Sequence, residues 1–153
     1  MLLFFVFSLF ILTVPQKAKS EELIHKTKLI SLVNQARKKI GLSDVSSNEK
    51  LQETAKNRLK DMQKKKYFSH LSPDNKNIKF FLQESNYKMI LAGENLAKNF
   101  TNEEELNSAW LNSFLHRRII MGPIYKDIGI ASGWTEINQK NHYITVMVLG
   151  LEK

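Results

Sequence analysis

The run that decides the fold is Tyr143–Leu149, which reads Tyr-Ile-Thr-Val-Met-Val-Leu. Nearly all of its residues are apolar or β-branched, a pattern typical of a strand that is covered on both faces. A second strand is predicted at Ile128–Trp134, and the polar stretch Thr135–Asn141 between them is predicted to be a hairpin loop. The two strands therefore indicate a small antiparallel sheet.

The residues before this strand pair carry the spacing of amphipathic helices. Across residues 21–40, apolar side chains recur every three or four positions. Capping boxes at Ser46–Glu49 and Thr101–Glu104 predict the starts of two further helices. A short helix is predicted over residues 78–82, whereas residues 87–97 are predicted to be extended or irregular. Helices followed by a strand pair indicate an α+β fold in which helices sandwich the sheet.

The helix that starts near Ser47 has one apolar stripe, which consists of Leu51, Ala55, Leu59 and Met62. Its charged residues are predicted to occupy the far side and the end of the helix: Arg58, Lys60, Lys64, Lys65 and Lys66. Lysines late in a helix also suit the negative end of the helix dipole.

The first 20 residues are predicted to be a secretory signal peptide. Leu2–Val14 is apolar apart from Ser8 and Thr13, and Ala18-Lys19-Ser20 has the small-x-small pattern of a signal-peptidase site. The alternatives are an uncleaved anchor and a buried helix. We therefore expect residues 21–153 to form one exported domain, in the periplasm, at the cell surface or in the medium.

Charge and cysteine content restrict the partners. Without Lys17 and Lys19, 21 basic residues face 15 acidic ones, a net charge of +6 that would favour anionic partners such as lipid head groups, although solvated helix faces are the favoured explanation. No basic run is interleaved with aromatic residues, which argues against nucleic-acid binding. Since there is no cysteine, disulfide-linked partners, thiolate metal sites and thiol nucleophiles are excluded.

Three polar residues are candidates for a functional site. His70 closes the cluster Tyr67-Phe68-Ser69-His70, Glu94 interrupts an apolar segment, and His116 follows the helix that contains Trp110. No pair has the spacing of a helical metal site. From the residues alone, local roles are favoured: Glu94 would accept backbone N–H bonds in a glycine turn, and His116 would cap the end of the helix.

Several sequence blocks, which occur in a fixed order, shift the interpretation of these three residues from local roles toward a shared site. They are Tyr67-Phe68-Ser69-His70, Ala92-Gly93-Glu94-Asn95-Leu96-Ala97, Ala109-Trp110 with Asn112-Ser113, and His116-Arg117 followed by Pro123. In sequence and spacing, residues 29–150 resemble the compact bacterial branch of the CAP superfamily of cysteine-rich secretory, antigen 5 and pathogenesis-related proteins. The resemblance implies a three-layer α-β-α sandwich and a cleft into which His70, Glu94 and His116 project.

The resemblance also implies a chemistry for this cleft. His70 and His116 would bind a divalent ion such as zinc, and Glu94 would orient an imidazole or accept a proton from a bound water. Two departures from the family pattern bear on the site. No second glutamate lies between Trp110 and His116, and the bulky pair Phe114-Leu115 replaces smaller residues, so it would displace the His116 ring or narrow the cleft.

We therefore expect a binding module at or outside the cell envelope, with an envelope, lipid or host ligand. One alternative is a metal-dependent, peptidase-like hydrolase that uses Glu94 as its base. Another is a protein that binds lipid or associates peripherally with a membrane surface. Ser69 or Ser113 as a nucleophile is disfavoured, because Ser69 adjoins His70 and neighbours on an extended chain point apart. The family is not known for one shared reaction, so an enzyme is the less favoured expectation.

Overall fold

The computed structural model describes residues 23–153 of the chain. The predicted signal peptide, residues 1–20, lies outside the described residues. Of the helices that the model describes, none combines the length and the apolar character needed to cross a bilayer.

Helices and strands follow one another in a mixed order along the described chain. In sequence they are α1 (Lys26–Lys38), β1 (Ser46–Ser47), α2 (Glu49–Lys65), α3 (Ile78–Glu84), β2 (Met89–Lys98), α4 (Glu103–Asn112), α5 (Phe114–Ile120), β3 (Asp127–Ile137) and β4 (Lys140–Glu152).

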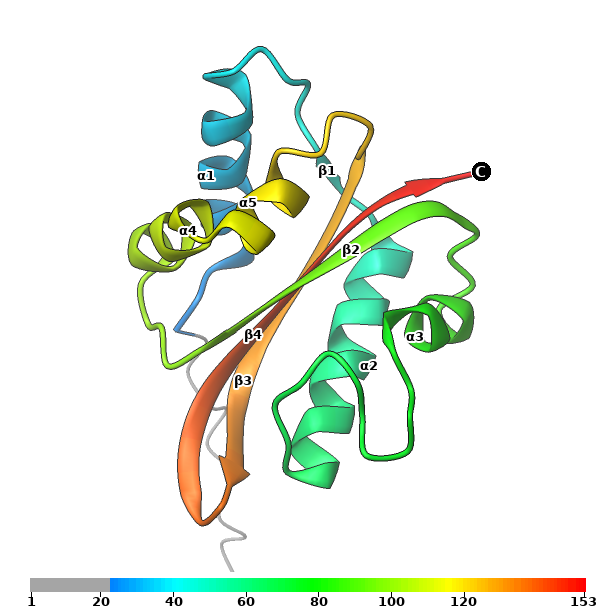
Figure 1. The fold of residues 1–153 in the computed structure, drawn as a ribbon, viewed down its shortest axis with the longest axis vertical. Coiled ribbons are helices and arrows are strands. Elements are labelled where there is room, and N and C mark those ends of the chain that lie inside the picture. The colour runs from blue at the N-terminus through cyan, green and yellow to red at the C-terminus, as the bar shows by residue number, and fades with distance from the viewer. Residues whose placement is uncertain (1–22) are drawn as a thin grey trace, which may run out of the picture.

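The strands form one sheet in the order β1-β3-β4-β2. β4 pairs antiparallel with both β3 and β2, whereas the short β1 pairs parallel with β3. Helices α2 and α3 cover one face of this sheet, and α1, α4 and α5 cover the other (Figure 1). The predicted α+β fold and its three-layer α-β-α arrangement are confirmed.

Strand β4 lies between two hydrophobic cores. Tyr143, Met147 and Leu149 point into the core beneath α1 and α4. Ile144, Val146 and Val148 point into the core beneath α2 and α3. Successive side chains of a strand point to opposite faces, so the continuous apolar run serves both cores, as the sequence predicted.

A glycine sets how closely α2 approaches the sheet. A Cβ atom on Gly129 of β3 would lie 2.2 Å from the backbone carbonyl carbon and oxygen of Leu51 in α2. Because the obstacle is backbone, a side chain at residue 129 would push the helix away from the sheet. The position of α2 matters for the site, since Arg58 lies on this helix two turns after Leu51.

The element boundaries correct four details of the sequence prediction. Both capping boxes are displaced by a residue or two, because Asn48 caps α2 and Asn102 caps α4. Ser46 and Ser47 belong to β1 and pair with β3. The hairpin loop is much shorter than residues 135–141: Asn138 and Gln139, with φ of 51° and 60°, form the turn, and positive φ at both positions is what a tight two-residue hairpin requires. The fourth detail concerns residues 87–97, predicted to be extended or irregular: strand β2 spans Met89–Lys98 and has a register shift between Met89 and Leu91.

The remaining difference lies next to His116. The sequence suggested one helix ending near His116, but the backbone of Ser113 is extended, with ψ of 121°, and separates α4 from α5. His116 therefore sits in the middle of a short separate helix. Ser113 occupies the N-cap position of α5 without a side-chain cap hydrogen bond, and serine is a residue type favoured at that position, which is the signal in the sequence that marks this break.

Candidate functional site

The candidate site lies along β2, the edge strand of the sheet. Glu94 points from β2 toward α2, whereas its neighbour Asn95 points toward α5. These adjacent residues of β2 therefore contact the two different helical layers. His70 belongs to the segment between α2 and α3, and His116 belongs to α5, so the two histidines come from opposite layers.

Glu94 is buried, and both of its carboxylate oxygens are engaged. Oε1 accepts a hydrogen bond from Nε of Arg58 at 2.8 Å, and Oε2 lies 2.7 Å from Nδ1 of His70. The expectation that Glu94 satisfies backbone N–H groups in a glycine turn is therefore wrong. Its partners are side chains from α2 and from the loop that follows α2.

Arg58 is the residue that sequence reasoning misplaced. It was assigned to the polar side of α2, but its side chain is fully buried. Besides Glu94, it donates hydrogen bonds to the Tyr67 hydroxyl and to the Ser69 carbonyl oxygen. Position 58 comes seven residues after Leu51, which is the spacing of the apolar stripe, so periodicity alone would have placed it facing inward.

Tyr67 and Asp61 extend this network toward the surface. The Tyr67 hydroxyl donates to Oδ2 of Asp61 at 2.6 Å, and the Arg58 guanidinium lies 5.4 Å from the centre of the Tyr67 ring. Burial, followed by the bond to Asp61, raises the pKa of Tyr67 to about 12. Tyr67 therefore stays protonated at neutral pH and helps to fix the segment that presents His70.

His70 combines a fixed ring nitrogen with an exposed one. Its side chain is 63% exposed although Nδ1 contacts a buried carboxylate. When Nδ1 donates its proton to Glu94, Nε2 carries a lone pair. The same arrangement, with a carboxylate behind the ring, orients histidines that bind metals.

His116 is held by a hydroxyl and by its own backbone. Nδ1 lies 2.7 Å from Oγ of Ser113, and the His116 carbonyl oxygen accepts a hydrogen bond from Nδ2 of Asn95 at 3.1 Å. Trp110, which packs beneath this region, donates from Nε1 to the Leu96 carbonyl oxygen at 3.3 Å. These bonds join β2 to α5 through Asn95 and α4 to β2 through Trp110.

The electrostatics of the site act on His116. The pKa of His116 is lowered from its ordinary value of 6.5, first by burial and second by the charge of His70. His116 is accordingly biased toward the neutral form, which is the form that binds metals.

The pair Phe114-Leu115 lies on the surface of α5. The two residues are 66% and 68% exposed, so they do not pack over the cleft. That their bulk displaces the His116 ring or narrows the cleft stays a prediction. Phe114 instead lines a hollow on the outer surface of α5, together with Ile40 and Arg117.

The donor set decides what this site can hold. Across residues 23–153, no group of three or more His, Cys, Asp or Glu side chains is arranged to hold a metal ion. The oxygens of Glu94 are already engaged, which leaves the two imidazoles. Two imidazoles supply at most two protein ligands, so an ion held by both would take water or an external ligand in its other positions, and these residues do not make a closed site.

A serine hydrolase arrangement is not assembled. Ser113 contacts His116, whereas the carboxylate of Glu94 contacts His70. A triad needs a serine and a carboxylate on the same histidine. In this site the serine contacts one histidine and the carboxylate contacts the other. The other candidate nucleophile, Ser69, accepts a hydrogen bond at its hydroxyl from the Leu71 backbone N–H.

Comparison of the sequence with known proteins gives one family and a bacterial relative. The family model described as CAP, the cysteine-rich secretory protein family, matches residues 30–148. The chain is 33% identical over 124 residues to the protein YkwD of Bacillus subtilis (strain 168), which covers 78% of this chain and 48% of YkwD. The chain thus spans about half the length of this curated relative.

Solved structures show the same fold. An outer surface protein from Borrelia burgdorferi aligns with a TM-score of 0.71 at 20% identity, over 83% of this chain and 92% of that one. An extracellular protein containing an SCP domain from Bacillus anthracis str. Ames aligns with a TM-score of 0.68 at 25% identity, over 82% of this chain and 40% of that one.

Proposed function

Because this chain belongs to the CAP family of cysteine-rich secretory proteins, we propose that it is an exported binding module whose cleft takes a divalent cation such as zinc. The resemblance that its sequence blocks suggested is confirmed by the family match over residues 30–148. In this proposal Nε2 of His70 and Nε2 of His116 are the protein ligands, and the open positions of the ion receive the partner.

One observation carries the proposal. Glu94 is buried, is paired with Arg58 and contacts Nδ1 of His70 at 2.7 Å. Burying a carboxylate and a guanidinium is costly, and their main visible effect here is to fix the orientation of an otherwise exposed imidazole. The contact between Oγ of Ser113 and Nδ1 of His116 is compatible with the same tautomer, in which Nδ1 donates to the hydroxyl and Nε2 is free. A bound ion supplies a positive centre on which an anionic or carbonyl group of the partner can bind.

Export is proposed on two grounds. The apolar residues 2–14 followed by Ala18-Lys19-Ser20 have the form of a secretory signal. Two proteins of similar fold are described as an outer surface protein and as an extracellular protein. Fractionation of cells that produce the full chain, followed by mass spectrometry of the N-terminus, tests export and cleavage after Ser20 together.

Calorimetric titration with zinc tests the cleft. We expect one site in the native protein and no binding in the double variant His70→Ala/His116→Ala. The matched control is His142→Ala, because His142 contacts Asn99 and takes no part in the cleft. Zinc binding should survive in this control. Absence of heat in the native protein, or equal loss in the control, would contradict the proposal.

A hydrolase is the function that would replace this proposal. Glu94 is buried, and each of its carboxylate oxygens already holds one side-chain partner, so it is poorly placed to accept a proton from a bound water. We therefore expect no turnover of broad peptide and ester substrates, with zinc or with a chelator. Turnover that requires zinc and disappears in Glu94→Gln would show that the cleft is catalytic.

A further inference from the structure

The outer surface of α5 and the loop after α1 expose three large apolar side chains. Phe114, Leu115 and Ile40 are 66%, 68% and 60% exposed. Ile40, Phe114, Arg117, Arg118 and Met121 line a hollow of about 310 Å³. We call these five residues and Leu115 the α5 patch. Large contiguous apolar exposure on a protein surface indicates a binding face.

The backbone beneath the α5 patch is fixed. Arg37, which is buried in α1, donates from Nη1 to the carbonyl oxygens of Ile120 and Gly122 at 2.6 and 2.9 Å. These bonds join α1 to the end of α5 and to the loop after it (Figure 1). The exposed apolar side chains are therefore presented by a rigid base.

The charge of the α5 patch has one sign. Arg117 and Arg118 are exposed, and no acidic residue occurs in the sequence between Glu105 and Asp127. Asp44, the first acidic residue after α1, is paired with Lys38 at 2.9 Å. Within residues 23–153, no ion pair involves either arginine of the patch.

From this combination we propose that the α5 patch docks the protein on an anionic lipid bilayer. Phe114, Leu115 and Ile40 would enter the boundary between head groups and acyl chains, and the arginines would bind lipid phosphates. Each basic residue near an anionic leaflet adds attraction that decays within a Debye length.

The same charges disfavour a second copy of the chain as the occupant. A two-fold interface brings the same surface of both copies together. On the α5 patch it would bring four guanidinium groups together without the carboxylates needed to compensate them. A bilayer surface supplies the opposite charge and an apolar phase at once.

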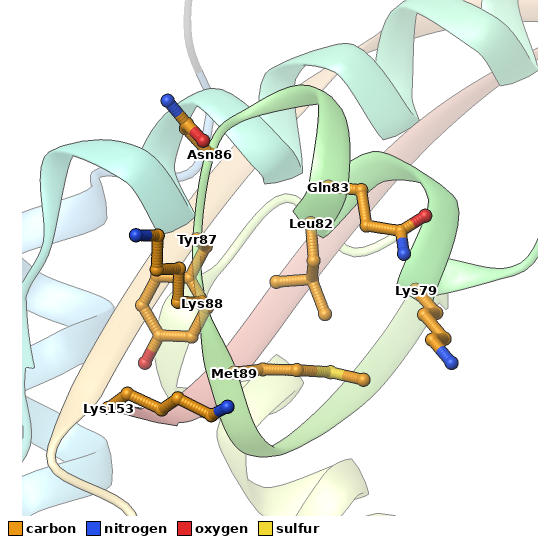
Figure 2. Close-up of a pocket in the computed structure, with 8 residues that line it drawn as sticks. All are labelled: Lys79, Leu82, Gln83, Asn86, Tyr87, Lys88, Met89 and Lys153. Carbon is orange, nitrogen blue, oxygen red and sulfur yellow. The ribbon is translucent and has the colours of Figure 1, made fainter.

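A second hollow with basic lining residues serves as a comparison for the α5 patch. It measures about 440 Å³, lies between α3 and the start of β2, and has Lys79, Lys88 and Lys153 among its lining residues (Figure 2). Its apolar floor is recessed, because Leu82 and Tyr87 are buried. This hollow shares the charge of the α5 patch but cannot insert side chains into a bilayer, so its lysines serve as a charge control.

Co-sedimentation with vesicles tests the proposal, with a chelator present so that zinc plays no part. We expect binding to vesicles of phosphatidylcholine with phosphatidylglycerol and little binding to phosphatidylcholine alone. Arg117→Gln/Arg118→Gln should weaken binding about 30-fold, since each basic residue adds about 1 kcal/mol at an anionic surface. Phe114→Ser/Leu115→Ser should weaken it by about tenfold or more.

Two control variants locate the effect. Lys79→Gln/Lys88→Gln removes the same charge elsewhere, and Ile90→Ser/Leu91→Ser removes exposed apolar side chains from β2. Both variants should bind the vesicles with an affinity within about twofold of that of the native protein, which is a small difference in binding free energy. Equal loss in patch and control variants, or equal binding to both kinds of vesicle, overturns the proposal. So does a native dimer that Phe114→Ser/Leu115→Ser converts to a monomer in light scattering, because it makes the patch a protein interface.

Discussion

The two histidines of the candidate site are supported in different ways. His70 rests on a buried ion pair, since Glu94 links its ring to Arg58, and Arg58 also binds the Tyr67 hydroxyl and the Ser69 carbonyl oxygen. His116 rests on the hydroxyl of Ser113, three residues earlier in the chain, and on a hydrogen bond that its carbonyl oxygen accepts from Nδ2 of Asn95.

The two kinds of support predict two kinds of effect. Changes beside His70 should alter the stability of the domain, and changes beside His116 should alter only the imidazole. The His70 side ties together α2, β2 and the loop between α2 and α3 through charged groups without access to water, so its removal should affect the whole domain. The His116 side is nearly local to α5. A change there should alter the imidazole while leaving the fold intact.

The largest expected effect is that of Arg58→Ala. This variant leaves Glu94 buried without its partner and removes the support of Tyr67 and Ser69. We expect the free energy of unfolding to fall by about 3–5 kcal/mol, the usual cost of breaking a buried ion pair. Urea denaturation followed by circular dichroism measures it.

Two further variants make this measurement specific. Arg118→Ala, at an exposed position on α5, should change stability by no more than about 0.5 kcal/mol. Arg58→Met/Glu94→Leu should recover most of the loss, because no unpaired charge remains buried. If Arg58→Ala costs less than about 1 kcal/mol, the two sides of the cleft do not differ in stability as the structure indicates.

Glu94→Gln should have the next largest effect, on the proposed zinc site. Replacing the group behind a ligating imidazole usually weakens metal binding about 10–100-fold. The amide cannot provide the charge that stabilises the proton on Nδ1 of His70. The control is Glu136→Gln, which removes a surface carboxylate paired with Lys66 and should leave zinc affinity unchanged. Equal affinities in a calorimetric titration would show that Glu94 has no role in orienting His70.

Sequence patterns predicted the layers of this fold well, because periodicity reports directly on burial. The apolar run of β4 and the stripe of α2 faced the cores as expected. The prediction placed Arg58 on the polar side of α2 because arginine is charged, although the helical period places position 58 on the apolar stripe. A buried arginine is rare unless it is paired, and its partner Glu94 lies 36 residues away.

The site itself was predictable only in part. The three residues were identified from family blocks, but nothing local indicates that His70 and His116 belong to opposite layers on either side of β2. Their placement depends on the position of β2, which pairs with β4 at an edge of the sheet. Such pairing is a long-range property that spacing within one segment does not contain. The exposure of Phe114-Leu115 similarly depends on the break at Ser113, which turns α5 relative to α4.

Ser113→Ala should have a smaller effect than Glu94→Gln. A neutral hydroxyl holds Nδ1 of His116 less strongly than a carboxylate holds that of His70. We expect zinc affinity to fall by less than about tenfold and stability to change by about 1 kcal/mol or less. Ser108→Ala, at an exposed serine of α4, is the control and should match the native protein. If Ser113→Ala equals or exceeds Glu94→Gln, the ranking of the two sides is reversed.

The smallest expected effect is on the titration of His116 in the metal-free protein. Burial and the charge of His70 lower its pKa below 6.5, so the unfolded chain binds a proton more readily than the folded one. The contribution of His116 to the free energy of unfolding is fully present above its ordinary pKa of 6.5. This contribution declines as the pH falls from 6.5 through the lower pKa of the folded protein. In His70→Ala the second cause disappears while burial remains, and the pKa of His116 should rise part of the way back. NMR titration of the ring protons measures the shift, with His142→Ala as the control that should not move it. An unchanged midpoint in His70→Ala would mean that the two imidazoles do not sense each other, and the two sides would then be separate features instead of one cleft.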